Sequence, residues 1–311
     1  MSHRSPVCLL APAAIFAAAG CVGDASDATV EPTPDAGAND TDVLGDSAIA
    51  EPDAAPAGSM ALTFEARVGD QPFSCGTAFG GFGPNADWSI EFLDARLYVH
   101  GVELLAPDGE WEEAEVVDDT PWQNDGIALL DFEDRTGTCG NGTTVVRSDV
   151  QLDADPEVDW QGVRFTVGVP FKQNHGDASV AAAPLNYTAL FWNWQGGYKF
   201  VRADINVTGP EGPVGSFNVH IGSTGCDGTP VGGVNGCANP NRSTIELRGF
   251  NPATSPITVQ LGSLYAGLAE PFNTADTPPG CMSGNDDPEC GPVYDALGLG
   301  ETDQTLFGVA E

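Results

Sequence analysis

The chain has very little positive charge. Its 311 residues include 11 Lys and Arg against 45 Asp and Glu, a formal net charge of -34. Such a field repels nucleic acid and anionic lipid, so both are excluded as partners. The chain also lacks the long apolar run of about 18 residues that a membrane-spanning helix needs. Hydrophobic residues still make up 41% of it, which is enough to bury a core and excludes a wholly disordered protein.

The N-terminal residues have the pattern of a signal peptide for export. Residues 1–20 have a basic start followed by an apolar run, the layout of a secretory signal peptide. The small residues before Cys21 resemble a bacterial lipobox, in which cleavage precedes the cysteine and its thiol is lipidated. A plain signal-peptidase site with an incidental cysteine is the alternative. Lipidation predicts a protein in the periplasm or at the cell surface that touches the membrane only through its anchor. Val22 after the cysteine favours the outer membrane.

A tether separates this anchor from the folded part. Residues 21–58 are acidic and contain no Lys, Arg or aromatic residue. Such a segment cannot bury enough apolar surface to offset its ordering entropy, so we expect a disordered spacer rather than a metal-gathering arm. Residues 59–311 then form a single domain.

Six cysteines remain after the one in the signal, Cys8, and the lipid site. An even number in an exported domain predicts disulfides. No C-x₂-C pair occurs, which disfavours a zinc ribbon. Sequence alone leaves the pairing open, and proximity favours two local bridges and one long one: Cys226–Cys237, Cys281–Cys290 and Cys75–Cys139.

Short alternating segments predict an all-β fold. Residues 62–68 alternate apolar and polar side chains, and so do residues 89–100. Many such strands separated by turn signals indicate a β-sandwich with disulfide-stapled loops. The Gly196-Gly197 pair predicts a hairpin between 186–194 and 198–207, and the acidic tail 270–311 reads as an irregular stapled loop. The other expected strands are 127–132, 143–151, 162–169, 214–221, 243–248 and 256–261.

Three histidines remain after removal of the signal. His100 and His220 fall on the polar side of their alternating strands, away from the predicted core. His175 follows Asn174 in a loop. Imidazole suits copper, zinc and nickel, but no local motif such as H-E-x-x-H links the three, so exposed surface histidines are the alternative.

Two tryptophans share the segment Phe191-Trp-Asn-Trp194. Trp192 and Trp194 are two residues apart, so on one strand they would share a face. On physical grounds alone, packing in or across a sheet explains them.

The folded part resembles the four-cysteine "metallo-mystery pair" family, that of the methanobactin-operon MbnP proteins. The order of motifs spans residues 62 to about 298. The resemblance rests on these segments: Pro72–Gly76, Leu97–His100, Leu129–Phe132, Val167–Phe171 with Asn174-His175, Phe191–Trp194, Gly197–Phe200, Val219–Cys226, Cys237–Arg242 and Cys281-Met282.

The resemblance implies a copper-binding protein that is encoded beside a MauG-like diheme c-type cytochrome peroxidase. That partner would oxidise one tryptophan of the W-x-W motif to kynurenine, and Trp192 is favoured over Trp194. His100, His175 and His220 become the implied copper ligands. The family's four cysteines would be Cys75, Cys139, Cys226 and Cys237, with a third bridge added by Cys281 and Cys290.

Three other interpretations stay open. One is a surface or adhesion domain without metal. Another is calcium binding by acidic loops such as Asp153, Asp155 and Asp159, although no D-x-D-x-D-G loop is present. The third is an enzyme, but no G-x-S-x-G and no nucleophile with its base is found, and Gly222–Gly225 beside His220 reads as a turn. We therefore expect a binding protein rather than an enzyme.

Overall fold

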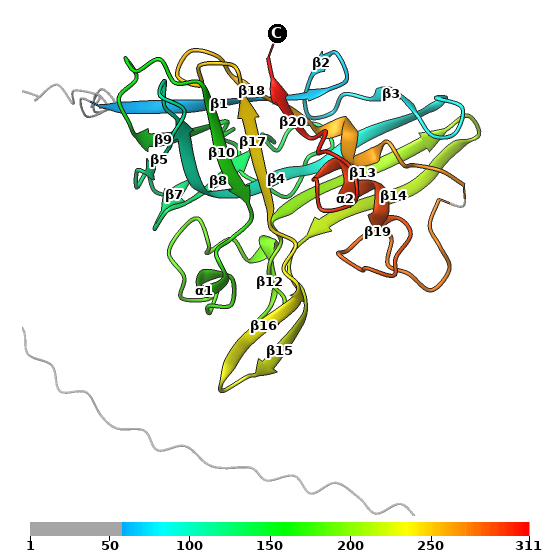
Figure 1. The fold of residues 1–311 in the computed structure, drawn as a ribbon. Coiled ribbons are helices and arrows are strands. Elements are labelled where there is room, and N and C mark those ends of the chain that lie inside the picture. The colour runs from blue at the N-terminus through cyan, green and yellow to red at the C-terminus, as the bar shows by residue number, and fades with distance from the viewer. Residues whose placement is uncertain (1–57, 271, 311) are drawn as a thin grey trace, which may run out of the picture. The chain divides into compact units, whose positions relative to one another are not determined.

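The structure is a computed structural model that describes residues 58–270 and 272–310. The predicted signal peptide and nearly all of the tether, including Cys21, lie outside the described residues. Within them the chain is mostly β-structure, as predicted (Figure 1). No helix in these two ranges is long and apolar enough to cross a membrane.

The smaller of the two main sheets has the strand order β20-β18-β1-β9-β6, and β2 pairs with β1. Alternation along β1 buries Leu62 and Phe64 on one side. The bounds of its strands are β1 Ser59–Val68, β2 Gln71–Pro72, β6 Glu115–Val116, β9 Asp149–Asp153, β18 Ile257–Gln260 and β20 Phe307–Val309.

The larger sheet has the order β17-β10-β4-β13-β14-β19 and is organised around β4, which also pairs with β3, β5 and β8, while β7 pairs with β8. Leu97 and Val99 of β4 face the smaller sheet in one core, whereas Tyr98 belongs to a second one. The strands are β3 Phe79–Phe82, β4 Trp88–Leu105, β5 Trp111–Glu113, β7 Gln123–Asn124, β8 Ile127–Asp131, β10 Gly162–Val167, β13 Val201–Gly209, β14 Gly212–Ile221, β17 Ser243–Arg248 and β19 Gly280–Cys281.

The main core lies between the two sheets, which confirms the sandwich. Phe64 of the smaller sheet meets Phe165 of the larger sheet edge-on, with ring centroids 5.7 Å apart. Phe307 closes the same cluster at 5.2 Å from Phe165. Edge-to-face contacts of this kind add to the burial of the rings.

A second core covers the opposite face of the larger sheet, on the side where the sequence predicted polar residues. Tyr98 packs there against Tyr198, with centroids 5.9 Å apart, and donates its hydroxyl to Pro184 O at 2.9 Å. The covering segment, residues 169–200, contains α1 Phe171–Asn174, the 3₁₀ turn η1 Thr188–Leu190, and the hairpin of β11 Phe191–Asn193 and β12 Gly197–Tyr198. This cover carries His175 and both W-x-W tryptophans.

The expected strand at 186–194 is mostly wrong. Residues 188–190 form η1, and β11 ends at Asn193, whose Oδ1 accepts hydrogen bonds from the amides of Gln195 and Gly196. This local turn takes Trp194 out of the strand, so the two indoles do not share a strand face. The predicted hairpin exists but is short, and β13 belongs to the main sheet instead.

Three further differences concern loops. The strand expected at 143–151 begins only at Asp149. A hairpin of β15 Thr224–Thr229 and β16 Gly233–Asn239 projects below the sheets beside α1 (Figure 1). The tail expected to be irregular contains β19, α2 Cys290–Ala296 and β20, and it follows a second 3₁₀ turn, η2 Leu261–Tyr265.

The three disulfides are those that proximity favoured: Cys75–Cys139, Cys226–Cys237 and Cys281–Cys290.

Candidate metal centre

Trp192 is held between two glycines. A Cβ added to Gly222 would lie 2.7 Å from Cζ3 of the Trp192 ring, and one added to Gly196 would lie 3.2 Å from Cε3. Only glycine lets the backbone come so close at Gly222. The indole is half-buried and borders a hollow of about 390 Å³ that Met282 and Cys226 also line. Trp194, in the turn, is 36% exposed.

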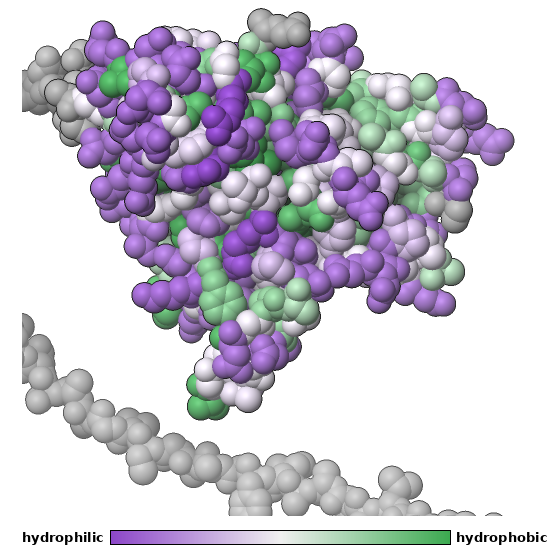
Figure 2. Space-filling model, in the orientation of Figure 1, coloured by the Kyte–Doolittle hydropathy of each residue, from purple (hydrophilic) through white to green (hydrophobic). Residues whose placement is uncertain are grey.

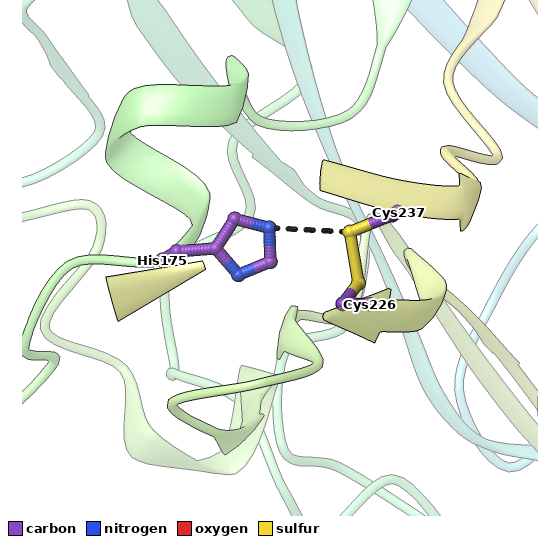
Figure 3. Close-up of side chains that lie close together, drawn as sticks. All are labelled: His175, Cys226 and Cys237. Atoms are coloured by element: carbon purple, nitrogen blue, oxygen red, sulfur yellow. Dashed lines mark hydrogen bonds between the residues drawn. A yellow bond between two sulfur atoms is a disulfide. The ribbon is translucent and has the colours of Figure 1, made fainter. Parts of the chain in front are cut away.

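His175 lies against the disulfide of the projecting hairpin. It directly follows α1, and its Nε2 is 3.5 Å from Cys237 Sγ (Figure 3). Its ring also meets Phe171 edge-on, with centroids 4.9 Å apart. Because both sulfurs are in a disulfide, they offer no thiolate, and the cluster of His175, Cys226 and Cys237 is not a metal site in this form.

Asn174 orients the His175 ring. This fully buried amide accepts a hydrogen bond from the Tyr198 N–H at 2.8 Å, which identifies Oδ1 as its acceptor side. Its Nδ2 therefore donates to His175 Nε2 at 3.2 Å. A Cβ on Gly197 would lie 2.4 Å from Asn174 Nδ2, so the Gly-Gly turn is needed for Asn174 to reach the hairpin. The sequence reasoning missed this role, although the adjacent Asn and His and the Gly-Gly pair were visible.

His175 has the properties of an available imidazole ligand. Burial lowers its pKa, and the positive charge of Arg242 acts in the same direction, while the Trp194 backbone opposes them. The ring is therefore neutral at neutral pH, and Asn174 leaves its proton on Nδ1. A metal at Nε2 would displace the hydrogen bond from Asn174 and would have to enter beside Cys237 Sγ, which lies 3.5 Å from that nitrogen.

His100, on β4, is also a neutral imidazole with one ring nitrogen engaged. Its Nδ1 donates to Gly168 O at 3.0 Å, which leaves the lone pair on Nε2. Burial lowers the pKa of His100, and Arg242 again contributes. Arg242 itself is anchored by donating to Val169 O at 2.6 Å and lies over the Phe200 ring. One guanidinium thus favours the neutral form of both His100 and His175.

The ring of His220 instead contacts the carboxylate of Asp204. Its Nε2 lies 2.8 Å from Asp204 Oδ1, a close contact that does not meet the geometry of a hydrogen bond, and neither atom has a hydrogen-bond partner elsewhere in the described residues. Burial opposes ionisation of Asp204, but His220 and Arg202 lower its pKa below the ordinary value. The His220 backbone O accepts from Ser283 Oγ at 3.0 Å, and that hydroxyl in turn accepts from the amide of Gly222, the residue under Trp192.

A buried charge network extends from His220 across the larger sheet. Arg96 makes a bidentate pair with Asp94, at 2.8 and 2.6 Å, and both side chains are almost fully buried. Burial raises the pKa of Asp131 to about 7, although Arg96 opposes this, and Glu133 and Asp94 add repulsion. Glu133 is also fully buried, and burial raises its pKa as well. The polar face of the sheet is therefore a covered network.

The network predicts a pH dependence of stability. Asp131 has a higher pKa in the folded chain than the ordinary value of 3.8, so the folded state binds a proton more tightly than the unfolded state does. Its contribution to stability is complete at about pH 4 and is lost as the pH rises through about 7. Asparagine cannot ionise. We therefore expect the change in the free energy of unfolding caused by Asp131→Asn to be about 2 kcal/mol more favourable at pH 8 than at pH 5. Urea midpoints of this variant and of the exposed control Glu112→Gln at both pH values check it; equal shifts in the two variants would contradict it.

The three predicted ligands are not assembled as one cluster. The ring nitrogens of His100, His175 and His220 do not all lie within 4.8 Å of one another; among the described residues, His175 is grouped with Cys226 and Cys237 instead. His175 is the histidine that the structure brings to the W-x-W hairpin. The backbone of His220 is linked to Gly222 through the Ser283 hydroxyl, and His100 donates from Nδ1 to Gly168 O.

Comparison with known proteins decides the family. A sequence model described as MbnP matches residues 57–283, more than half of the chain. The chain belongs to the MbnP family. The solved structure of MbnP from Methylosinus trichosporium is similar to this chain, with a TM-score of 0.66 and 26% identity over 81% of this chain and 98% of that chain. No curated protein matches.

The range that the family model matches contains most residues of the candidate site. It includes the W-x-W hairpin, the three histidines and the segment up to Ser283. Cys290 and helix α2 follow the matched range, so the second cysteine of the third bridge is on the part of the chain beyond it.

Proposed function

We propose that this MbnP-family chain is an exported copper-binding protein whose site forms at the W-x-W hairpin once Trp192 has been oxidised to kynurenine. One observation carries the proposal. A neutral imidazole, His175, lies beside the hairpin whose indole borders an open hollow, and the lone pair on its Nε2 is engaged by one hydrogen bond, from Asn174 at 3.2 Å. The protein binds metal and performs no catalysis of its own.

The residues present fit copper. Imidazole nitrogen and thioether sulfur suit copper, which also heads the divalent affinity order. His175 and His100 are both neutral and keep a lone pair on Nε2. Met282 brings a sulfur to the hollow that Trp192 lines. His220 is the third histidine of the proposed set, and its use as a ligand requires separation of Nε2 from Asp204.

Oxidation would change what Trp192 can do. An indole N–H is a donor only and has no lone pair for a metal. Kynurenine carries a ketone and an aryl amine, both of which coordinate. Opening the ring needs space, and Trp192 borders the hollow while its ring also lies against Gly222. The oxidising equivalents come from a peroxide through a partner, which we propose to be a MauG-like diheme c-type cytochrome peroxidase, and the ring carbon that is lost leaves as formate after hydrolysis.

The proposed location follows from the N-terminal segment. Lipidation at Cys21 would anchor the protein to the outer membrane, in the periplasm or at the cell surface. The acidic tether would then hold the domain away from the lipid, and the net charge of -34 would steer a basic face of the partner toward it.

Mass spectrometry together with metal analysis tests the proposal. The native protein, produced with and without the diheme partner, is digested and its W-x-W peptide weighed, and copper is measured on the same samples. We expect loss of one carbon and gain of one oxygen at Trp192, and about one bound copper per chain, only with the partner. An unmodified peptide without copper in both samples would leave a surface or adhesion domain without metal as the function.

A further inference from the structure

Two carboxylates, Asp287 and Glu289, lie two residues apart in the stapled tail. Asp287 is 7% exposed and follows Cys281 inside the loop closed by Cys290. Its Oδ1 accepts from the Glu289 N–H at 3.2 Å, and Glu289 Oε1 accepts from the N–H and the hydroxyl of Thr274, each at 2.7 Å. Asp287 Oδ2 and Glu289 Oε2 are both buried, and neither has a hydrogen-bond partner.

No cationic side chain of the described residues pairs with Asp287 or Glu289. Residues 249–311 contain no Lys, Arg or His, and none of the ion pairs in the described part of the chain involves Asp287 or Glu289. Two buried carboxylate oxygens without a hydrogen-bond donor are costly unless a counter-charge balances them.

We propose that Asp287 and Glu289 hold a calcium ion. Calcium takes six to eight oxygen ligands and tolerates irregular geometry, and the ligands here are hard oxygens that do not suit copper. Thr274 adds a hydroxyl next to the pair, since its Oγ1 lies 2.7 Å from Glu289 Oε1. The Gly284 carbonyl, which accepts from the Asp287 N–H, is a backbone oxygen of the same loop. Water would complete the set.

The ion would fix the stapled tail against the sandwich. The loop between Cys281 and Cys290 also contains Ser283, whose Oγ contacts the backbone of His220 and Gly222. A cation at Asp287 would hold this loop closed and keep it on β14. The inference does not rest on copper binding or on tryptophan oxidation, so it is tested on copper-free protein.

Thermal unfolding with and without calcium tests the site. The purified copper-free protein is melted at pH 7.5 in EGTA and in CaCl₂, and binding is measured directly by equilibrium dialysis with radioactive calcium. We expect calcium in hundredfold excess over its Kd to raise Tm by about 5 °C, because it binds only the folded state. Asp287→Asn should lose both the shift and the bound calcium, whereas the exposed neighbour Asp286→Asn should keep both.

The outcomes separate a metal ion from a shared proton. An unchanged Tm and no bound calcium in the unaltered protein would overturn the site. A calcium response that persists in full in Asp287→Asn would do the same. If the pair is neutralised by a proton instead, Asp287→Asn is more stable than the unaltered protein at pH 7.5 and calcium has no effect on either, which also refutes the proposal.

Discussion

Replacing Trp192 by phenylalanine is expected to abolish both the oxidative modification and the stoichiometric binding of copper. Phenylalanine can still rest on Gly196 and Gly222 and border the hollow, so the fold is kept. It has no pyrrole ring to open and yields neither ketone nor aryl amine. After production with the diheme partner, copper per chain should fall from about one to a small fraction of that, which metal analysis and peptide mass would measure.

Trp194→Phe is the matched control. Trp194 lies in the turn after Asn193, is 36% exposed and does not line the hollow. This variant should be modified at Trp192 and should bind copper like the unaltered protein. The assignment fails if Trp192→Phe still carries an oxidised Trp194 and a full complement of copper, since the modified residue would then be the exposed one.

Replacing His175 by alanine is expected to weaken copper binding by more than about 100-fold. Loss of groups that only orient ligands already costs about 10- to 100-fold in metal affinity, and His175 is the imidazole that the structure brings to the hairpin. The effect should exceed that of His220→Ala, because His220 Nε2 faces Asp204. Competition with a chromophoric copper chelator measures each affinity.

Lys172→Ala is the control for His175→Ala. Lys172 lies on α1 three residues before His175 and is exposed, so its loss leaves the ring of His175 in place. Far-ultraviolet circular dichroism and a thiol assay would verify that the hairpin and its Cys226–Cys237 bridge are intact in both variants. Unchanged copper affinity in His175→Ala would remove this histidine from the ligand set.

Alternation and cysteine spacing carried most of the fold prediction. The period of two along residues 62–68 and 89–100 is a local property of extended chain, and it correctly placed β1 and β4 and the sandwich between their sheets. The predictions failed where a short-range contact competes with the strand. Asn193 captures two following amides and ends β11, which no alternation pattern shows.

The sequence by itself determined the acidic charge, the all-β class and, through its motifs, the MbnP family. Only the tertiary structure decided the surroundings of each histidine. His175 meets Asn174 and a disulfide sulfur, His100 meets Gly168, and His220 meets Asp204. The reason is physical: apart from Asn174, which directly precedes His175, these partners come from other strands and loops. The neighbours of each imidazole therefore depend on how those elements pack.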